Sequence, residues 1–349
     1  MTLPQTYLAT MLLTIFTMLC WGSWANTFKM AGKWRFELFY FDYAIGMLFA
    51  AGVAALTFGT LGSDGFQFQD DLMQTGRRNI FFGALGGVVF NLANMLLVAA
   101  ISVAGLAVAF PIGIGVALVI GVGWNYWLKP QGNPTLLFGG AVVIVMAIIM
   151  DAMAYRAHAA AALEVDAKAG KLKTSSPKPS PKGIILSLAS GLLMGSFFPL
   201  VEIGKGHGAG MGPYAIGFVF AVGVFLSTFV FNLFFMNLPV QGEPVEVLDY
   251  FRGGSLRLHL LGLLGGIIWF AGAIASFVAA SAEPPAQVGP AVSYAIGQGA
   301  TLVSVLWGLL VWKEFSGADF RVKILLSLTV LLFICGLALV SIAPIYQGR

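Results

Sequence analysis

Charged residues are scarce in this sequence. Lys, Arg, Asp and Glu together make up 10% of the 349 residues, whereas a soluble globular domain carries roughly 25%. So few charges cannot cover a water-facing surface, which excludes a soluble enzyme and a nucleic-acid-binding domain. Cysteine is also rare: Cys20 and Cys335 are the two present, and both lie in apolar runs. This argues against a disulfide framework and against a thiolate metal site.

The sequence is instead rich in long apolar runs, with 58% hydrophobic residues and a mean hydropathy of +0.88. A hydrocarbon core of about 30 Å requires about 20 apolar residues of helix. The runs do not alternate as barrel strands do. We therefore predict an all-α integral membrane protein with ten transmembrane helices. The runs lie near residues 6–26, 38–58, 80–103, 106–128, 134–154, 183–203, 213–236, 258–280, 286–312 and 323–345.

The basic residues sort by loop, which predicts the orientation. Of the 19 Lys and Arg residues, all but Arg77, Arg78, Lys129, Lys205 and Arg349 lie in loops that follow odd-numbered helices. The positive-inside rule places the larger group in the cytoplasm. We expect a multi-pass protein of the cell (inner) membrane with both termini outside.

One segment, 155–182, differs in composition from the rest of the chain. It is rich in Ala, Lys, Ser and Pro and cannot bury apolar area, so it predicts a flexible cytoplasmic linker. The linker divides the chain into a first five-helix repeat, 1–154, and a second, 183–349.

An internal repeat supports this division. At an offset of 179, residues 83–111 align with 262–290 without a gap, and Gly22-Ser23 recurs as Gly195-Ser196. Tyr43-Ala44-Ile45-Gly46 recurs as Tyr214-Ala215-Ile216-Gly217. Because five is odd, the second copy enters the membrane from the opposite face, which predicts two inverted repeats around a central site. Small or helix-breaking residues in the paired segments predict close packing or hinges, although glycine is also simply common in membrane helices. These residues are Gly86, Gly87, Gly265, Gly266, Pro111 and Pro290.

Polar side chains inside the spans are the candidate solute contacts, because each is costly in lipid unless it faces protein or water. Trp21 and Trp24 continue a threonine stripe at mid-depth, and a structural stripe is the alternative. Asn91 and Asn94 lie three residues apart, where an inter-helix clasp explains them equally well. Gln287, Tyr294 and Gln298 are spaced to share one helical face.

Acidic groups in or near the spans are the candidate proton carriers. Asp42 near the start of the second helix and Glu202 near the end of the sixth lie closest to the predicted core. A carboxyl withdrawn from water can bind a proton near neutrality, but both residues also fit solvated helix ends. Motifs for nucleotide hydrolysis, acyl transfer or zinc proteolysis are missing, so we expect no enzyme activity, no metal and no cofactor.

Several motifs resemble the ten-helix branch of the drug/metabolite transporter superfamily. Gly86-Gly87-Val88-Val89-Phe90-Asn91-Leu92-Ala93-Asn94, Asp42-Tyr43 and Gln287-Val288-Gly289-Pro290 look like plant ureide permeases. Cys20-Trp21-Gly22-Ser23, Gly297-Gln298 and Lys313-Glu314 are similar to bacterial glucose/ribose uptake permeases. The resemblance implies two inverted repeats, a central cavity and proton-linked uptake of ureides, nucleobases or sugars. The central segment lacks the phosphate-loop-like sequence of plant ureide permeases.

Together these features predict a secondary transporter that imports a small neutral polar solute with protons, by alternating access. Aromatic walls with amides favour a sugar or a flat ureide or nucleobase over a charged solute. The expected partners are the solute, protons and the lipid bilayer, without nucleic acid, for a monomer or homodimer. An exporter of metabolites or drugs is the alternative, and a passive channel is a further one.

Overall fold

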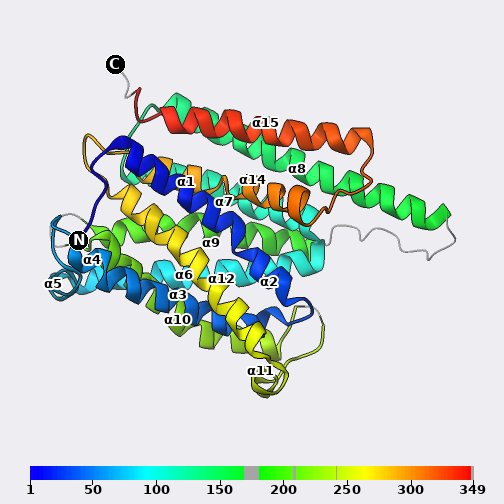
Figure 1. Ribbon diagram of the computed structural model, residues 1–349, viewed down its shortest axis with the longest axis horizontal. Helices are drawn as coiled ribbons and strands as arrows, with labels where there is room; N and C mark the ends of the chain where they lie inside the picture. Colours follow the sequence, from blue (N-terminus) through cyan, green and yellow to red (C-terminus); the bar gives the residue numbers. More distant parts are fainter. Residues whose placement is uncertain (169–180, 207–209, 241, 347–349) are drawn as a thin grey trace.

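The computed structural model describes residues 1–168, 181–206, 210–240 and 242–346, and long helices run side by side along the bundle (Figure 1). Within these residues, ten helical segments are long and apolar enough to cross a membrane. The predicted all-α fold with ten spans is confirmed, and the chain is a multi-pass membrane protein.

The spans follow the predicted order along the chain. The first five are α1 with α2 (Tyr7–Ser23 and Ala25–Ala31), α3 with α4 (Phe36–Leu56 and Phe58–Leu61), α6 (Arg77–Ala104), α7 (Leu106–Leu128) and α8 (Pro134–Lys168). The last five are α9 (Pro181–Lys205), α10 (Pro213–Asn237), α12 (Leu256–Ala280), α13 with α14 and η1 (Pro290–Gly297, Ala300–Leu306 and Trp307–Val311) and α15 (Phe320–Ile342). The short helices α5 (Phe68–Gln74) and α11 (Val247–Gly253) lie at opposite ends of the bundle (Figure 1).

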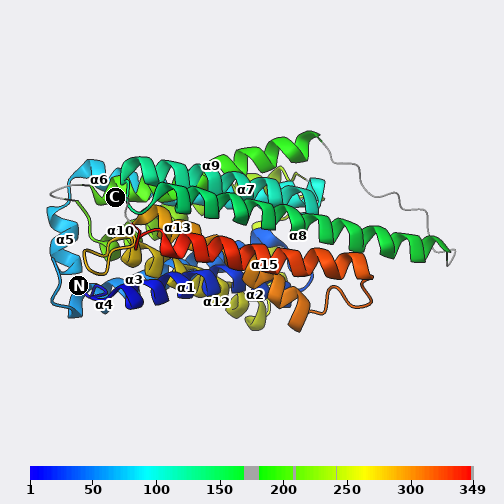
Figure 2. The ribbon, with the colours of Figure 1, turned by 90° about the horizontal axis from the view of Figure 1, so that it is seen from above.

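Successive spans run in opposite directions, so their connections collect at two ends of the bundle (Figures 1 and 2). The end that holds the start of α1 and the end of α15 is called the Lys205 end. The end that holds α11 and the turn after η1 is called the Glu314 end. The hydroxyl of Tyr7 donates to the carbonyl oxygen of Ser341 at 2.5 Å, which ties the first span to the last.

Close glycine contacts hold α6 against α10. A Cβ added to Gly87 would overlap the carbonyl oxygen of Phe220, and one added to Gly223 would overlap the carbonyl oxygen of Ala84. Each helix therefore presents a glycine to the partner's backbone, and the two contacts are reciprocal. In lipid, such close approach contributes the packing that holds spans together.

The crossing of α12 with α3 has the same construction. A Cβ on Gly266 would overlap the carbonyl oxygen of Tyr43, and a Cβ on Gly46 would overlap that of Leu263. In both crossings the contacted carbonyl lies three residues before the partner's glycine. The two crossings are therefore equivalent: α6 of the first half corresponds to α12 of the second half, and α3 corresponds to α10.

Other helix crossings also occur in equivalent pairs, one in each half of the chain. Gly22 of α1 lies against Ala300 of α14, and Gly195 of α9 lies against Ala117 of α7. The last spans of the two halves, α8 and α15, pack through Gly140 and Gly336. A Cβ on either glycine would lie against the carbonyl oxygen of the other. This matched set of contacts is compatible with two inverted repeats, and it supports the predicted equivalence of Gly22 with Gly195.

The contacts also correct two details of the sequence alignment. Gly46 is the counterpart of Gly223 and not of Gly217, so the recurring Tyr-Ala-Ile-Gly is out of register with the packing. Gly105 and Gly289 both begin a helix with φ near 80° (79° and 82°), a left-handed conformation that glycine adopts easily. The hairpin before Gly289 is thus longer than its counterpart, and the gapless alignment does not extend through it.

The ninth span is not the continuous helix expected over 286–312. It begins at Pro290, is interrupted after Gly297, resumes at Ala300 and ends in the π-helical turn η1. The interruption falls at Gln298 and Gly299. The backbone stays right-handed there, and tighter hydrogen bonds replace the α-helical ones: the N–H of Gly299 donates to Ile296, and that of Leu302 donates to Gly299.

The expected linker begins later than predicted. Residues 155–168 continue α8, whose 35 residues make it the longest described helix. The linker was predicted because the segment is rich in Lys, Ser and Pro. Its first part is rich in alanine, the best helix former, and these alanines extend the helix. At the far boundary, 181 and 182 already belong to α9, and the intervening 169–180 lies outside the described residues.

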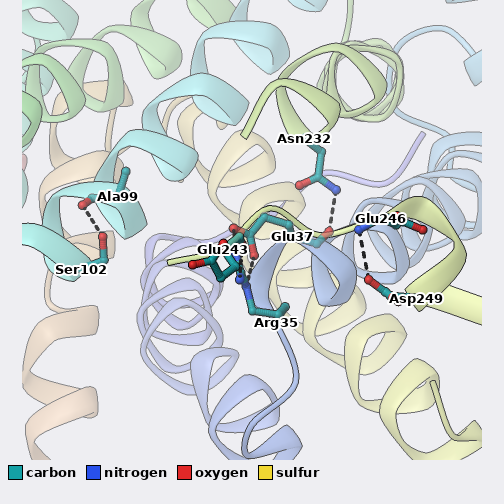
Figure 3. A network of polar contacts seen from close by, with 8 residues as sticks. All are labelled: Arg35, Glu37, Ala99, Ser102, Asn232, Glu243, Glu246 and Asp249. Atoms are coloured by element: carbon teal, nitrogen blue, oxygen red, sulfur yellow. Dashed lines mark hydrogen bonds and ion pairs between the residues drawn. The ribbon is translucent and has the colours of Figure 1, made fainter. Parts of the chain in front are cut away.

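Polar contacts tie the connection between α10 and α11 to the start of α3 (Figure 3). The guanidinium of Arg35 donates to the carboxylate of Glu37 at 2.8 Å and to the carbonyl oxygen of Glu243 at 3.0 Å. The amide of Asn232 donates to the carbonyl oxygen of Glu37. The hydrogen-bonded Glu37 carboxylate raises the pKa of Arg35, so this anchor stays charged.

Candidate functional site

A packed group of aromatic rings, here called the aromatic core, lies between the two halves of the bundle. Trp269 of α12 stacks between Trp21 of α1 and Phe220 of α10, with centroid separations of 5.6 Å and 6.0 Å. Phe90 and Phe197 pack against the same indole. Trp21, a predicted solute contact, is therefore part of a closed central packing. Its indole Nε1 is buried and has no hydrogen-bond partner among the described residues.

Trp24 and Asn94 meet through two tyrosines. The Trp24 ring lies 5.0 Å from that of Tyr43, which stacks on Tyr40 at 4.9 Å. The amide of Asn94 donates to the Tyr40 hydroxyl at 3.2 Å. Both tyrosines are fully buried, and the Tyr43 hydroxyl lacks a partner within the described chain. Since buried polar groups are normally paired, this hydroxyl is a candidate solute contact that the sequence did not single out.

Asn91 forms an inter-helix clasp. Its side-chain nitrogen contacts the carbonyl oxygen of Val224 at 3.2 Å and the hydroxyls of Ser227 and Thr228 at 2.7 Å and 3.2 Å, all on α10. The side chain is fully buried at this contact. Of the two interpretations open from the sequence, this conformation favours the clasp, because the amide donors are used between α6 and α10.

The three predicted residues of the ninth span do not share one face. Gln287 precedes the first helical residue, Pro290, and Gln298 follows the last residue of α13. The common face assumed one continuous helix, and that assumption is wrong here. Tyr294 is fully buried, and its hydroxyl lies within hydrogen-bond distance of the carbonyl oxygens of Ala117 and Met194, at 3.2 Å and 3.3 Å.

Gln298 occupies the break between α13 and α14. It is 8% exposed, and none of the described residues forms a hydrogen bond with its side chain. An amide without partners beside an interrupted helix is suited to contact a polar solute. Gln298 is the predicted residue of this span whose surroundings best match a solute contact.

Asp42 lies in a hydrogen-bonded triad near the Glu314 end. Its Oδ2 is 2.8 Å from His259 Nδ1 of α12, and its Oδ1 accepts a 2.5 Å hydrogen bond from the Tyr250 hydroxyl of α11. The helix begins at Phe36, so Asp42 is buried almost two turns inside it. The solvated helix-end interpretation is therefore wrong for Asp42.

Glu202 is paired as well. Its carboxylate lies 2.5 Å from the ammonium of Lys205, and the two side chains are 9% and 11% exposed. The Lys205 ammonium also donates to the carbonyl oxygen of Phe277 at 3.2 Å. Both residues line a cavity of about 610 Å³ at the Lys205 end. Additional charged residues line the same cavity: Arg78, Lys129 and Glu283.

A second cavity, of about 220 Å³, lies toward the Glu314 end and is here called the Asp151 cavity. It is lined by residues of α1, α2, α7, α8, α14 and η1. The sequence-predicted Pro111 contributes to its wall. The polar and aromatic lining comprises Asn26, Lys29, Asp151, Tyr155, Thr301, Ser304, Trp307, Trp312 and Glu314. Sequence reasoning did not assemble these residues, because they come from three stretches far apart in the chain, 26–29, 151–155 and 301–314.

A polar network closes the outer side of the Asp151 cavity. The carboxylate of Glu314 forms an ion pair with Lys29 and accepts a 2.8 Å hydrogen bond from the Tyr155 hydroxyl. The Lys29 ammonium lies 4.4 Å from the centre of the Trp312 ring. The network therefore joins α2, α8 and the turn after η1.

The candidate hinge residues occupy tight contacts. Gly86 lies against α9 near Val201, and Gly265 faces Thr27 of α2, while Gly87 and Gly266 form the crossings described above. Pro111 lies inside α7, whereas Pro290 is the first residue of α13. Proline at a first position removes no ladder hydrogen bond, so the expected ladder break is found at Pro111 and not at Pro290. Hinge motion at these positions stays a prediction.

Comparisons with known proteins indicate the kind of protein that the chain is similar to. A model of the ureide permease family matches residues 39–182. Ureide permease 2 of Arabidopsis thaliana is 24% identical, over 95% of this chain and 95% of its own length. Ureide permease 1 of the same plant is 24% identical over 86% of this chain and 87% of its own. A probable ureide permease A3 of Vigna unguiculata is 31% identical over 41% of this chain and 39% of its own.

A protein of known crystal structure has the same fold. It aligns over 99% of this chain and 100% of its own with a TM-score of 0.62, at 16% identity. At such low identity the likeness shows the fold alone. The chain is thus similar to ureide permeases along nearly its whole length, and these relatives are named as permeases and not as enzymes.

Proposed function

We propose that this chain is a membrane transporter that moves a small, neutral, polar solute inward by alternating access, coupled to protons. The relatives carry the name ureide permease, so a ureide is the first solute class to test. A nucleobase or a sugar offers similar polar groups on a compact ring, and these are the competing classes.

One observation carries the proposal. Matched glycine crossings pack two oppositely directed halves around a closed aromatic core, and a polar cavity lies toward each end of the bundle. Inverted halves around a central constriction allow a site to open first to one face and then to the other. Rocking of one half against the other would separate the rings of Trp21 and Trp269.

The solute site in this proposal forms at the aromatic core, between the two cavities. Trp21 and Trp24 supply flat apolar surfaces for a planar solute, and the indole N–H of Trp21 has no partner within the described part of the chain. Asn94, Tyr294 and Gln298 supply hydrogen-bonding groups close to these rings. Gln287 and Asn91 stay candidates for other conformations of the cycle, because here they lie in a loop and in a clasp.

The charge distribution supports an orientation. Most Lys and Arg residues of the described loops belong to the Glu314 end, so we propose that this end faces the cytoplasm of a cell membrane. Solute would then enter from the Lys205 end. Asp42 and Glu202 stay the sequence-based candidates for proton carriers, and each would have to exchange its present partner for a proton.

The test is uptake by the full chain reconstituted in lipid vesicles. Labelled allantoin, uracil and glucose represent a ureide, a nucleobase and a sugar. Saturable uptake of one probe, accelerated by the same unlabelled compound inside the vesicle, is expected for alternating access. Flux that grows linearly with concentration and shows no such acceleration would indicate a channel. Net efflux from preloaded cells would identify an exporter.

A further inference from the structure

We propose that Asp151 of α8 is the group that binds and releases the coupled proton. Asp151 is 7% exposed and lines the Asp151 cavity. Its Oδ1 is fully buried, and among the described residues neither carboxyl oxygen has a hydrogen-bond partner. An unpaired ionised carboxylate inside a membrane span is costly, and protonation removes the charge. This inference rests on the proposed transport function.

The other buried carboxyls of the spans differ in this respect. Asp42 already contacts His259 and Tyr250, and Glu202 already contacts Lys205. A proton that binds at either position must first displace a partner. Asp151 has no partner to displace, so a proton is the simplest compensation for its charge.

Among the described residues, the groups that face Asp151 include no cation that is free to pair with it. Lys29 is already paired with Glu314, and Glu314 itself is an anion that disfavours a second negative charge nearby. Uncharged side chains face the cavity from α7 and α14: Phe110, Pro111, Thr301, Ser304 and Val305. Where α15 packs on α8, its cations Arg321 and Lys323 are exposed at the Glu314 end.

A line of polar groups leads from the Asp151 cavity toward water. Asp151 and Tyr155 are four residues apart on α8 and therefore neighbours on one helical face. The Tyr155 hydroxyl donates to Glu314, whose side chain is 32% exposed at the Glu314 end. The chemistry is a reversible proton transfer in which the carboxylate of Asp151 becomes a carboxylic acid. When the bundle opens toward the Lys205 end, the same proton is exchanged with water there, and no electrons are transferred.

The test uses reconstituted full-length protein, with allantoin, uracil and glucose as probes. Asp151→Asn removes the titratable group at nearly constant size, Asp151→Glu restores a carboxyl, and Asp70→Asn is the matched control on the exposed surface of α5. Two fluxes are compared: accumulation driven by an imposed pH gradient, and exchange of labelled for unlabelled probe without a gradient. Infrared difference spectra between acid and alkaline buffers report a buried carboxylic acid without any solute.

We expect Asp151→Asn to lose gradient-driven accumulation by about tenfold or more while it keeps exchange, because a fixed neutral side chain cannot carry a proton. The carboxylic acid band should disappear in Asp151→Asn and persist in Asp70→Asn, and Asp151→Glu should recover part of the coupling. Gradient-driven accumulation that survives in Asp151→Asn, or an unchanged band, overturns the assignment.

Failure of the broader proposal gives a different result. If the wild type exchanges a probe but ignores the pH gradient, transport stands and the role of Asp151 is overturned. If the wild type moves none of the probes and the band is unchanged by Asp151→Asn, both proposals fail. If Asp42→Asn or Glu202→Gln alone abolishes coupling while Asp151→Asn keeps it, the carrier lies at that residue.

Discussion

Phe90 of α6 and Trp269 of α12 pack ring against ring at the centre of the bundle, with centroids 4.1 Å apart and planes inclined by 32°. These two residues are 179 positions apart, the offset at which the two halves of the sequence align. Each half thus contributes its equivalent residue to the same contact. A contact between equivalent residues lies on the axis that would relate two repeats, so any rocking of the halves must change this ring pair.

The glycine crossings give the first prediction. Gly266→Ala should lower the melting temperature, because its Cβ would overlap the backbone of Tyr43 and overpacking costs roughly 1–3 kcal/mol. Gly52→Ala is the matched control, since a Cβ there meets nothing within 4 Å. In a helix, that change is neutral or favourable by up to about 1 kcal/mol. Thermal unfolding in detergent gives the melting temperature of both variants. Equal melting temperatures for Gly266→Ala and Gly52→Ala would contradict the close contact at Gly266.

The Asn91 clasp gives the second. Asn91→Ala removes the hydrogen bonds to α10 and should cost about 1–2 kcal/mol of stability, as inter-helix hydrogen bonds in membranes contribute roughly 0.6–1.7 kcal/mol each. Because the amide is engaged between helices, KM for the transported probe should change little. Asn237→Ala is the control, since that amide donates within its own helix. A large rise in KM with unchanged stability would assign Asn91 to the solute instead.

Trp21 separates a structural from a binding role. Trp21→Phe keeps an aromatic ring in the core but removes the unpaired indole N–H, so the folded state should lose no hydrogen bond. If the N–H binds solute, KM should rise by about tenfold, equivalent to about 1.4 kcal/mol. Trp307→Phe provides the contrast, because its Nε1 donates to the Ser23 hydroxyl at 2.9 Å and its loss should lower stability. An unchanged KM in Trp21→Phe removes the N–H from the site.

The network outside the Asp151 cavity predicts a pH dependence. Burial alone would raise the pKa of Glu314, but hydrogen bonds from Lys29 and Tyr155 lower it, and the net pKa lies below its ordinary value of 4.5. The ionised side chain therefore stabilises the folded state above that value, and the contribution is lost as the pH falls through the folded pKa.

Glu314→Gln should accordingly melt below the wild type at neutral pH, and the difference should close in acid. Glu243→Gln is the matched control, because that residue is exposed and contacts Arg35 through its backbone carbonyl. Unfolding curves across a pH series provide the measurement. A difference that persists at the acid limit would mean that Glu314 acts through something other than its charge.

The spans were predictable because length and apolar content are local properties of the chain. The sequence places the third span at 80–103, and the helix extends over Arg77–Ala104. The equivalence of Gly87 with Gly266 was also visible, since a glycine at a backbone contact must recur wherever the contact recurs. The interruption at Gln298 could not be predicted, because Gly299 is equally compatible with a continuous apolar helix.

The surroundings of a polar side chain depend on the rotation of its helix about the helix axis. A span that is apolar on all faces does not indicate this rotation. Asp42 and Glu202 were recognised as acidic groups near the core, but their partners were not. His259 is distant from Asp42 in sequence and meets it only after α12 packs on α3. The sequence does not single out Asp151, because it lies near the end of the span predicted over 134–154, whereas α8 continues well beyond it.

The π-helical turn at Trp307–Val311 sets the angular phase of the residues after it. There the N–H of Trp312 reaches back five residues, to the carbonyl oxygen of Trp307, so the turn holds one residue more than an α-helical turn. If the same residues were wound as an ordinary α-helix, the side chains after them would be rotated by about 100°. Trp312 would then point away from Asn26, and Glu314 would lose alignment with Lys29, so one surplus residue keeps this ion pair in register.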